Sequence, residues 1–279
     1  MKGKTILITG ANSGIGKEAA KELAKMGANL VIVCRNKERG EKAVKEIKSY
    51  SANEAVELYV CDLSKQTEIR DFARAFSSEH SRLDVLINNA GTVYMSYGET
   101  EEGIERTMAV NYFAPFLLTN LLLDMLIKSA PSRIINVASD AHFSGHIDLT
   151  DINSKKNWNP WRAYANSKLA LVLFTYELAR RLKDKGVTVN CLHPGAVRTN
   201  IWTHTGILRP FMMFASLFMK SPRKGAETII YLASSQEVEH VTGKYFVNNK
   251  ARPSSKESYD SDLAIKLWQL SMELTKLSV

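Results

Sequence analysis

The chain has 279 residues, of which 45% are hydrophobic, so it is long enough for one large α/β domain with a buried core. Its formal net charge is +8, but basic and acidic residues alternate, as over 37–48. That alternation is typical of a solvated helix surface and speaks against a nucleic-acid partner, while part of the excess charge suits a polyanionic cofactor. Neither a repeat nor a linker is evident, and we expect one domain over residues 1–279.

The cysteines and the first residues indicate a protein of a reducing compartment. Three cysteines lie far apart, within or at the ends of predicted strands: Cys34, Cys61 and Cys191. Reduced cysteines in such places usually pack as small hydrophobic residues. The first apolar run, 6–8, turns at Gly10 and is too short for a signal peptide. We therefore expect a cytoplasmic protein.

Apolar, β-branched runs alternate with amphipathic helical patterns along almost the whole chain. The predicted strands are 4–9, 29–34, 56–61, 84–88, 132–138, 187–192 and 244–247. The predicted helices are 14–26, 37–50, 65–79, 101–127, 161–185, 223–234 and 260–276. This order predicts an α/β fold, a single doubly wound (Rossmann) domain with a seven-stranded parallel sheet and helices on both faces. Ligands of such sheets bind beyond the carboxyl ends of the strands.

A glycine-dense turn joins the first strand to the first helix, with the spacing Gly-x-x-x-Gly-x-Gly. Such a turn aims backbone N–H groups and the positive end of a helix dipole at one point, which suits a phosphate group. The spacing alone is a weak signal, and a purely structural turn is the alternative. Its position between a strand and a helix favours a phosphate site. The residues expected to line it are Gly10, Asn12, Ser13, Gly14, Ile15 and Gly16.

Arg35 follows the second strand, where a carboxylate would bind the ribose 2′-hydroxyl of NAD. An arginine there favours a 2′-phosphate, and Lys17 and Arg39 add positive charge nearby. We therefore predict NADP(H) as the cofactor. The alternative is an ordinary surface arginine.

Polar and small residues also follow the third and fourth strands. Asp62 and Leu63 are placed to meet an adenine edge, although Asp62 could equally cap the next helix. After the fourth strand, Asn89, Ala90 and Gly91 leave room for a ribose against the backbone.

Three side chains that suit proton transfer come later in the chain. Ser139 follows the fifth strand, and Tyr164 and Lys168 stand at i and i+4 on one face of a helix. Asn111 lies inside a long helical pattern, where it is a poor helix former and could bend the helix. No group of His, Cys or acidic residues shows the spacing of metal ligands, so we predict no metal site.

These signals stand together in the order and spacing of one protein family. They are Thr9-Gly10-x3-Gly14-x-Gly16, Asp62, Asn88-Asn89-Ala90-Gly91, Asn111, Ser139, Tyr164-x3-Lys168 and Pro194-Gly195. With them, the chain resembles the short-chain dehydrogenase/reductase family over essentially its whole length. Residues 131–137, 166–170 and 192–199 most resemble its NADP-dependent retinol dehydrogenase branch.

The resemblance, with elementary acid–base chemistry, implies a mechanism. Tyr164 would be the general acid in reduction and the general base in oxidation, with its pKa lowered by the ammonium group of Lys168. Ser139 would hydrogen-bond the substrate oxygen, and Asn111 would hold a water that relays protons to Lys168. Tyr164 and Lys168 are also expected to contact the cofactor, Lys168 at the nicotinamide ribose. Further contacts in the loop after the sixth strand would be Pro194, Gly195, Val197 and Thr199.

Substrate specificity is expected in two irregular stretches, 140–162 and a lid insertion at about 200–222, both rich in aromatic residues or methionine. They predict a lipophilic aldehyde, ketone or alcohol as substrate. The apolar run 211–219 is too short to span a bilayer, and the sequence leaves open whether it covers the pocket or contacts a membrane surface. The resemblance further implies a homodimer through the helices that carry Asn111 and Tyr164. The alternative function is an NADP(H)-binding redox sensor without significant turnover.

Overall fold

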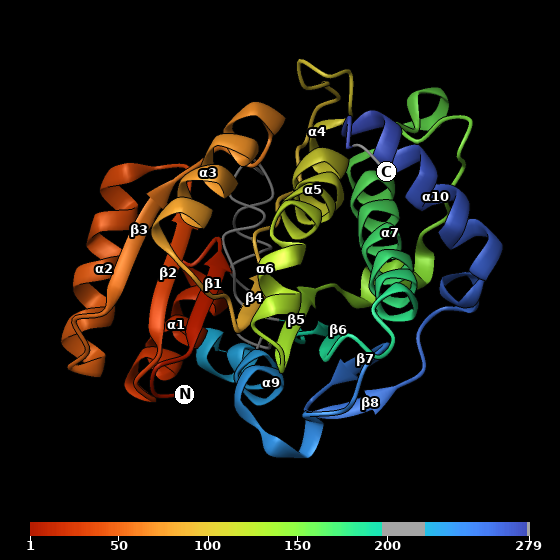
Figure 1. Ribbon diagram of the computed structural model, residues 1–279. Coiled ribbons are helices and arrows are strands. Elements are labelled where there is room, and N and C mark those ends of the chain that lie inside the picture. Colours follow the sequence, from red (N-terminus) through yellow and green to blue (C-terminus); the bar gives the residue numbers. More distant parts are fainter. Residues whose placement is uncertain (197–220, 278–279) are drawn as a thin grey trace.

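The computed structural model describes residues 1–196 and 221–277 and contains one eight-stranded sheet (Figure 1). The strand order is β3-β2-β1-β4-β5-β6-β7-β8. The bounds are Thr5–Thr9 (β1), Asn29–Cys34 (β2), Val56–Val60 (β3), Val85–Asn88 (β4), Ser132–Val137 (β5), Val187–His193 (β6), Lys244–Val247 (β7) and Lys250–Arg252 (β8). The pairs from β3 to β7 are all parallel, which confirms the doubly wound sheet predicted from the sequence.

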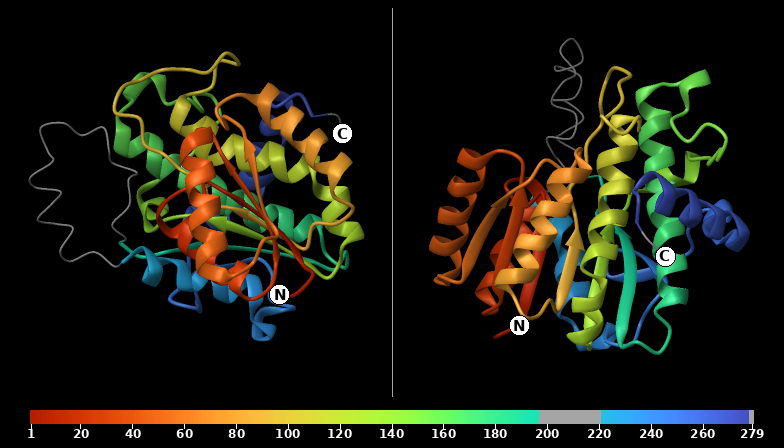
Figure 2. Two further views of the ribbon diagram at one scale, coloured as in Figure 1. Left: turned by 90° about the vertical axis from the view of Figure 1, so that its left-hand side faces the viewer. Right: turned by 45° about the horizontal axis from the view of Figure 1, so that its top comes forward.

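Helices cover both faces of the twisted sheet (Figure 2). The α-helices are Gly14–Lys25 (α1), Lys37–Ser51 (α2), Gln66–Glu79 (α3), Arg106–Met108 (α4), Ala114–Leu121 (α5), Leu123–Lys128 (α6), Pro160–Arg181 (α7), Pro222–Ser234 (α9) and Ser261–Leu274 (α10). Successive residues of a strand point to opposite faces, so Ile6 and Ile8 pack in one core with α1, α2 and α9. Leu7 packs in the other core, with α3 to α7 and α10. None of the described helices is long and apolar enough to cross a bilayer.

The sheet has one strand more than the sequence predicts. β8 pairs antiparallel with β7 through a two-residue turn at Asn248 and Asn249, whose φ angles are 51° and 62°. Two successive residues at positive φ form the tight hairpin turn that matches the twist of the strands, and asparagine tolerates this conformation. The prediction of an all-parallel sheet is therefore correct for seven strands and misses the antiparallel edge.

The long helix predicted over 101–127 is divided in the structure. Gly103 has a φ of +75°, which no right-handed helix contains, and α4 begins only after it, at Arg106. A π-helical turn (η1, Ala109–Phe113) then separates α4 from α5. The turn contains Asn111, the residue that the sequence indicates as a point of bending. π-helical turns often occur at functional sites.

Candidate active site

The carboxyl ends of β1 and β4 are joined by one hydroxyl and one amide. Thr9 Oγ1 accepts the backbone N–H groups of Asn89 and Ala90, both at 3.0 Å. Asn89 Nδ2 donates to the carbonyl oxygen of Thr9 at 2.7 Å and to that of Gly10 at 3.2 Å. These adjacent strands lie where the strand order reverses, which is the ligand-binding point of doubly wound sheets. The four hydrogen bonds fix the carboxyl ends of β1 and β4 against each other at this point.

The glycine turn packs directly on the residues that follow β4. Gly10 has a φ of +69°, and a Cβ atom on it would lie 2.8 Å from the Cα of Ala90. A Cβ atom on Gly16 would lie 2.9 Å from the carbonyl oxygen of Gly10 and would collide with the Asn89 side chain. Both positions therefore need glycine, and the turn is fixed against β4.

The N-terminus of α1 is open to an anion. Ser13 stands at the N-cap but makes no capping hydrogen bond with its side chain among the described residues, and the first turn holds no acidic residue. By contrast, side chains of Asn36, Asn159 and Ser221 cap α2, α7 and α9. Ile15 is buried in the core, so its backbone N–H, and not its side chain, is available to a ligand. Uncapped N–H groups and the helix dipole favour a phosphate group here.

The same region contains a buried hydrogen-bond acceptor to which no described residue donates. Asn89 Oδ1 is buried without a hydrogen-bond partner within the described part of the chain, while its Nδ2 is fully used. A buried carbonyl oxygen normally has a partner, because leaving it unpaired costs free energy. A polar ligand with a hydroxyl or amide donor fits this position, and a nucleotide cofactor carries such groups.

The predicted contacts at the adenine end are partly occupied by the protein itself. Lys17 Nζ pairs with Glu46 at 2.7 Å, whereas Arg35 is exposed just after β2. Asp62 Oδ1 accepts the backbone N–H of Ser64 at 3.0 Å and its hydroxyl at 2.8 Å, so this carboxylate closes the turn before α3. The carboxylate does not cap α3, whose N-cap is Lys65, so the capping alternative is wrong. Contacts of Asp62 and Leu63 with adenine stay a prediction.

Tyr164 and Lys168 lie on α7 and face the end of β5. Their exposed fractions are 8% and 4%, and Lys168 Nζ lies 5.7 Å from the centre of the Tyr164 ring. Nζ donates to the carbonyl oxygen of Val137 at 2.8 Å. Burial lowers the pKa of Lys168 to about 8 because the charged form loses its hydration. The structure thus brings the predicted pair to the carboxyl edge of the sheet.

Ser139 completes this group. Its Oγ accepts the backbone N–H of Ala141 at 3.2 Å, and it is hydrogen-bonded to Tyr164. Burial raises the pKa of Tyr164, and the bond with Ser139 acts in the opposite direction. The acidifying effect of Lys168 on this phenol stays a prediction. The loss of phenolate hydration outweighs the stabilisation that its neighbours provide.

Asn111 is fully buried and ties the segment after β4 to α7. Its Oδ1 accepts the N–H of Thr92 at 2.8 Å, and its Nδ2 donates to the Thr92 carbonyl oxygen at 2.9 Å and to Ser167 Oγ at 3.0 Å. A Cβ atom on Gly91 would lie 3.5 Å from both Asn111 Oδ1 and Lys168 Nζ. The two predicted side chains therefore flank the same glycine.

The remaining predicted contacts follow β6. Pro194 and Gly195 are described, and Gly195 has a φ of +90°. Val197, Thr199 and nearly all of the proposed lid, 200–222, lie outside the described residues, and so does the apolar run 211–219.

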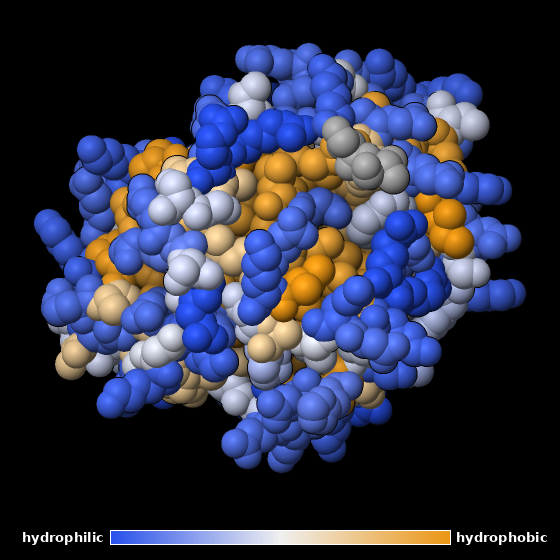
Figure 3. Space-filling view, in the orientation of Figure 1, coloured by the Kyte–Doolittle hydropathy of each residue, from blue (hydrophilic) through white to orange (hydrophobic). Residues whose placement is uncertain are grey.

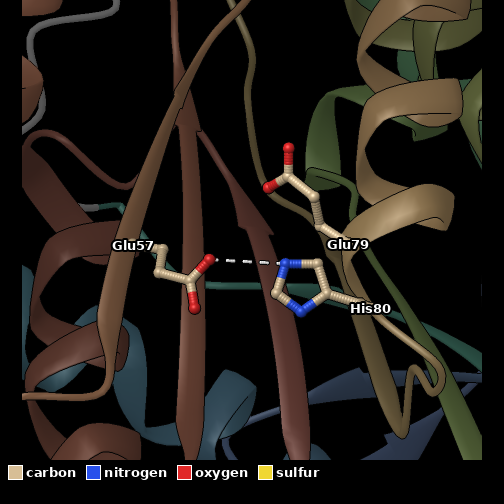
Figure 4. A group of neighbouring side chains, drawn as sticks. All are labelled: Glu57, Glu79 and His80. Carbon is tan, nitrogen blue, oxygen red and sulfur yellow. Dashed lines mark ion pairs between the residues drawn. The ribbon is translucent and has the colours of Figure 1, made fainter.

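One group that the sequence analysis missed lies on β3, a strand at the edge of the sheet. Glu57 on β3, with Glu79 and His80 at the end of α3, forms the only cluster in the described ranges with metal-like spacing (Figure 4). His80 Nε2 lies 3.4 Å from Glu57 Oε2, and Tyr59 donates its hydroxyl hydrogen to Glu79. Since Glu57 pairs with His80 and Glu79 pairs with Tyr59, we interpret the cluster as a network of contacts within the protein near its surface.

Comparison with known proteins gives the family. Residues 4–206 match the family model of short chain dehydrogenases. The chain is 46% identical to retinol dehydrogenase 13 of Mus musculus over 284 residues, covering 99% of this chain and 85% of that protein.

Solved structures also match this chain over most of its length. An uncharacterized protein from Mycobacterium paratuberculosis matches with a TM-score of 0.79 and 33% identity, covering 99% of this chain and 94% of that one. The Pseudomonas aeruginosa RhlG/NADP active-site complex matches with a TM-score of 0.72 and 27% identity, covering 88% and 94%. The chain therefore belongs to the short-chain dehydrogenase family, is similar to retinol dehydrogenases, and is an oxidoreductase of alcohols and carbonyl compounds that uses a nicotinamide cofactor.

Proposed function

We propose that the chain is an NADP(H)-dependent oxidoreductase that interconverts a lipophilic aldehyde or ketone and its alcohol, with Tyr164 as general acid and base. The observation that carries this proposal is the group formed by Ser139 with the buried Tyr164 and Lys168, together with an open helix N-terminus. A protein that only bound the nucleotide would have no need of all three side chains.

Each catalytic residue has a chemical task in this proposal. When bound, the nicotinamide supplies a hydride to the carbonyl carbon in reduction, or accepts one in oxidation. Tyr164 gives its phenolic proton to the substrate oxygen in reduction and takes it back in oxidation. Ser139 uses one Oγ lone pair on Ala141 N–H and has its hydroxyl hydrogen on Tyr164, from which this hydrogen can turn to the same oxygen when the substrate binds.

Lys168 supplies charge and a proton near neutral pH. With a pKa of about 8, its ammonium group can release and regain a proton under ordinary conditions. Its charged form stabilises a neighbouring phenolate when the proton of Tyr164 leaves. Asn111 holds Thr92 and Ser167 in place around Lys168 through both ends of its amide. A water held at Asn111 would connect Lys168 to solvent.

The preference for NADP(H) rests on Arg35. Its guanidinium is exposed just after β2, where a 2′-phosphate would lie, and Lys17 is already neutralised by Glu46. The phosphates that join the two halves of the cofactor would lie at the N-terminus of α1, near Gly10 to Gly16. The related NADP complex at 27% identity supports this choice.

The substrate proposal rests on exposed aromatic side chains near Tyr164. Trp161 is 51% exposed, and its ring centre lies 6.3 Å from that of Tyr164. Phe143, in the turn that follows Ser139, is 55% exposed. A lipophilic substrate can cover such surfaces on binding. The similarity to a retinol dehydrogenase supports a substrate of this kind.

Two accessory properties are also proposed, assembly as a homodimer and peripheral contact with a membrane surface. Apolar residues gather in the middle of the face that carries α5 and α6 (Figure 3). The half-buried Leu121 and Met125 belong to these two helices. In addition, α10 packs on α7, and the ring of its Trp268 lies 5.0 Å from that of Phe116 on α5. Sedimentation velocity tests the dimer, and co-sedimentation with liposomes tests the membrane contact.

The experiment that tests the main proposal is steady-state NADPH oxidation with a panel of lipophilic aldehydes and ketones. We expect turnover with at least one of them, and NADH to be a poorer donor. Tight NADPH binding without turnover of any carbonyl compound would favour the redox-sensor alternative.

A further inference from the structure

The side chain of His142 connects Ser139 to the C-terminal part of the chain. His142 lies in the 3-10 turn that follows Ser139 (η2, Asp140–Ser144) and is fully buried. Its Nδ1 lies 2.7 Å from the carbonyl oxygen of Ser139. Its Nε2 accepts the backbone N–H of Ser255 at 3.0 Å. One imidazole ring therefore bridges two segments that are 113 residues apart in the sequence.

These two contacts fix the protonation state of the ring. A backbone N–H can only donate, so Nε2 of His142 must be unprotonated. The ring proton then sits on Nδ1 and is donated to the carbonyl oxygen of Ser139. Burial lowers the pKa of His142, which agrees with a neutral ring.

The partner segment is itself attached to the catalytic helix. We call residues 254–259, which include the 3-10 turn η8 (Lys256–Tyr259), the C-terminal brace. Ser254 Oγ lies 2.7 Å from the hydroxyl of Tyr176 on α7, the helix that carries Tyr164 and Lys168. Glu257 accepts the backbone N–H of Ile147 at 2.9 Å, beyond the far end of the Ser139 turn.

Strands β6 and β7 hold the same turn from the other side. His193 Nδ1 accepts the backbone N–H of Asp140 at 3.1 Å, and the Tyr245 hydroxyl donates to Asp140 Oδ1 at 2.5 Å. The Tyr245 ring also lies edge-on to His142, with 4.8 Å between the ring centres. These contacts hold the His142 ring in one orientation against Ser139, the residue proposed to hydrogen-bond the substrate oxygen.

We propose that His142 is a positioning residue. Its two ring nitrogens hydrogen-bond Ser139 and Ser255, so that the C-terminal brace holds Ser139 where its hydroxyl can contact the substrate oxygen. The inference rests on the proposed function, because the place of Ser139 matters to turnover only if its hydroxyl contacts the substrate oxygen. A group that acts in the transition state loses much of its effect when it moves by a fraction of an ångström.

Three variants of His142 separate its two bonds. His142→Phe keeps a planar ring against Tyr245 but removes both hydrogen bonds. His142→Asn keeps a donor near the Nδ1 position and loses the acceptor for Ser255, and His142→Gln keeps an acceptor near Nε2 and loses the donor. Ser255→Ala is a matched control, because the Ser255 hydroxyl has no partner among the described residues and the backbone N–H is retained.

A second control removes a different histidine contact from the same region. His146 pairs with Glu257 of the brace at 3.1 Å, but its side chain is 78% exposed and it does not contact Ser139 in the described chain. His146→Gln should therefore not reproduce the loss of kcat that we expect for His142→Phe.

The readout is kcat per NADPH-binding site, measured together with KM for the carbonyl substrate and the dissociation constant of NADPH. We expect His142→Phe to lower kcat by about 10- to 100-fold with little change in KM or NADPH affinity. His142→Asn and His142→Gln should lie between it and the wild type, a partial rescue by each retained bond. General damage to the fold would instead lower NADPH binding and thermal stability.

A wild-type value of kcat in His142→Phe would overturn the proposal. If that variant does not fold, wild-type values of kcat in both His142→Asn and His142→Gln would overturn it.

A long-range ¹H–¹⁵N spectrum of the wild type gives a test without turnover. We expect a neutral ring protonated at Nδ1, and a ring protonated at Nε2 would contradict the arrangement. If the wild type reduces no carbonyl compound, the proposed function fails; if it does and His142→Phe matches it, only the role of His142 fails.

Discussion

The ammonium group of Lys168 donates a hydrogen bond of 2.8 Å to the carbonyl oxygen of Val137, the last residue of β5. The bond holds the amine at the carboxyl edge of the sheet, where Tyr164 also lies. The side chain is only 4% exposed, so its charge is kept in a place that burial penalises. Active sites commonly give up stability in this way for a function that needs the charge.

Replacing Lys168 with methionine should therefore stabilise the fold at neutral pH. The folded pKa of about 8 lies below the ordinary 10.5. The free-energy cost of holding the charged amine in the folded chain is therefore fully present below pH 8, and it decreases as the pH rises from 8 to 10.5. A shift of this size corresponds to roughly 3 kcal/mol, from which the lost bond to Val137 removes about 1 kcal/mol. Urea unfolding should show Lys168→Met more stable by about 2 kcal/mol at pH 7.

The pH dependence gives the control for this prediction. The advantage of Lys168→Met should have largely disappeared at pH 10, because the wild-type amine is then neutral in the folded chain. Lys17→Met removes a lysine that is paired with Glu46 near the surface and should bring no such gain. Equal stability of Lys168→Met and the wild type at pH 7 would contradict the account of the buried charge.

The close packing of the glycine turn predicts a large cost for a single methyl group. Gly10→Ala would place a Cβ atom 2.8 Å from the Cα of Ala90, in addition to the strain of a left-handed conformation. We expect a loss of about 2–5 kcal/mol from the two effects together. Chemical denaturation measures the loss.

Gly103→Ala separates the two effects. Gly103 also has a positive φ, +75°, but a Cβ atom there would meet nothing within 4 Å. Gly103→Ala should therefore lower the free energy of unfolding only by the strain of the left-handed conformation, about 1–2 kcal/mol. Similar losses in Gly103→Ala and Gly10→Ala would refute the role of the contact with Ala90.

The choice between the two nicotinamide cofactors should depend on Arg35. Arg35→Asp replaces the proposed partner of the 2′-phosphate by a carboxylate, which would repel that phosphate and accept a hydrogen bond from a 2′-hydroxyl. The ratio of kcat/KM for NADPH over NADH should fall by about tenfold or more. The same change at Arg252, an exposed residue of β8, controls for net charge. Unchanged selectivity in Arg35→Asp would remove Arg35 from the cofactor site.

The parallel strands could be predicted from the sequence because a strand covered on both faces is a nearly continuous apolar run. Residues 29–34 are such a run, and β2 has those bounds. β8 could not be predicted in this way, since its three residues are all exposed and carry no apolar signal. The Asn248-Asn249 pair was the one local hint of the hairpin.

The positions of the site residues could be predicted, but not their partners. Asn89 and Lys168 follow from motif spacing, whereas the bonds to Thr9 and Val137 join residues 80 and 31 positions apart. His142 was placed in the specificity stretch because its neighbours are aromatic. Its burial against Ser255 depends on the docking of the C-terminal brace, which no local pattern reveals.

The most direct test of the account is a comparison of Tyr164→Phe with the wild type, for carbonyl reduction by NADPH and for NADPH binding. The substitution removes one hydroxyl from a side chain that is 8% exposed and keeps the ring that packs with Val93 and Ala141. We predict that turnover is lost while NADPH affinity changes by less than about threefold, because the phenol acts on the substrate oxygen. Substantial turnover by Tyr164→Phe, with the protein folded and NADPH bound, would contradict the role of Tyr164 as the proton donor.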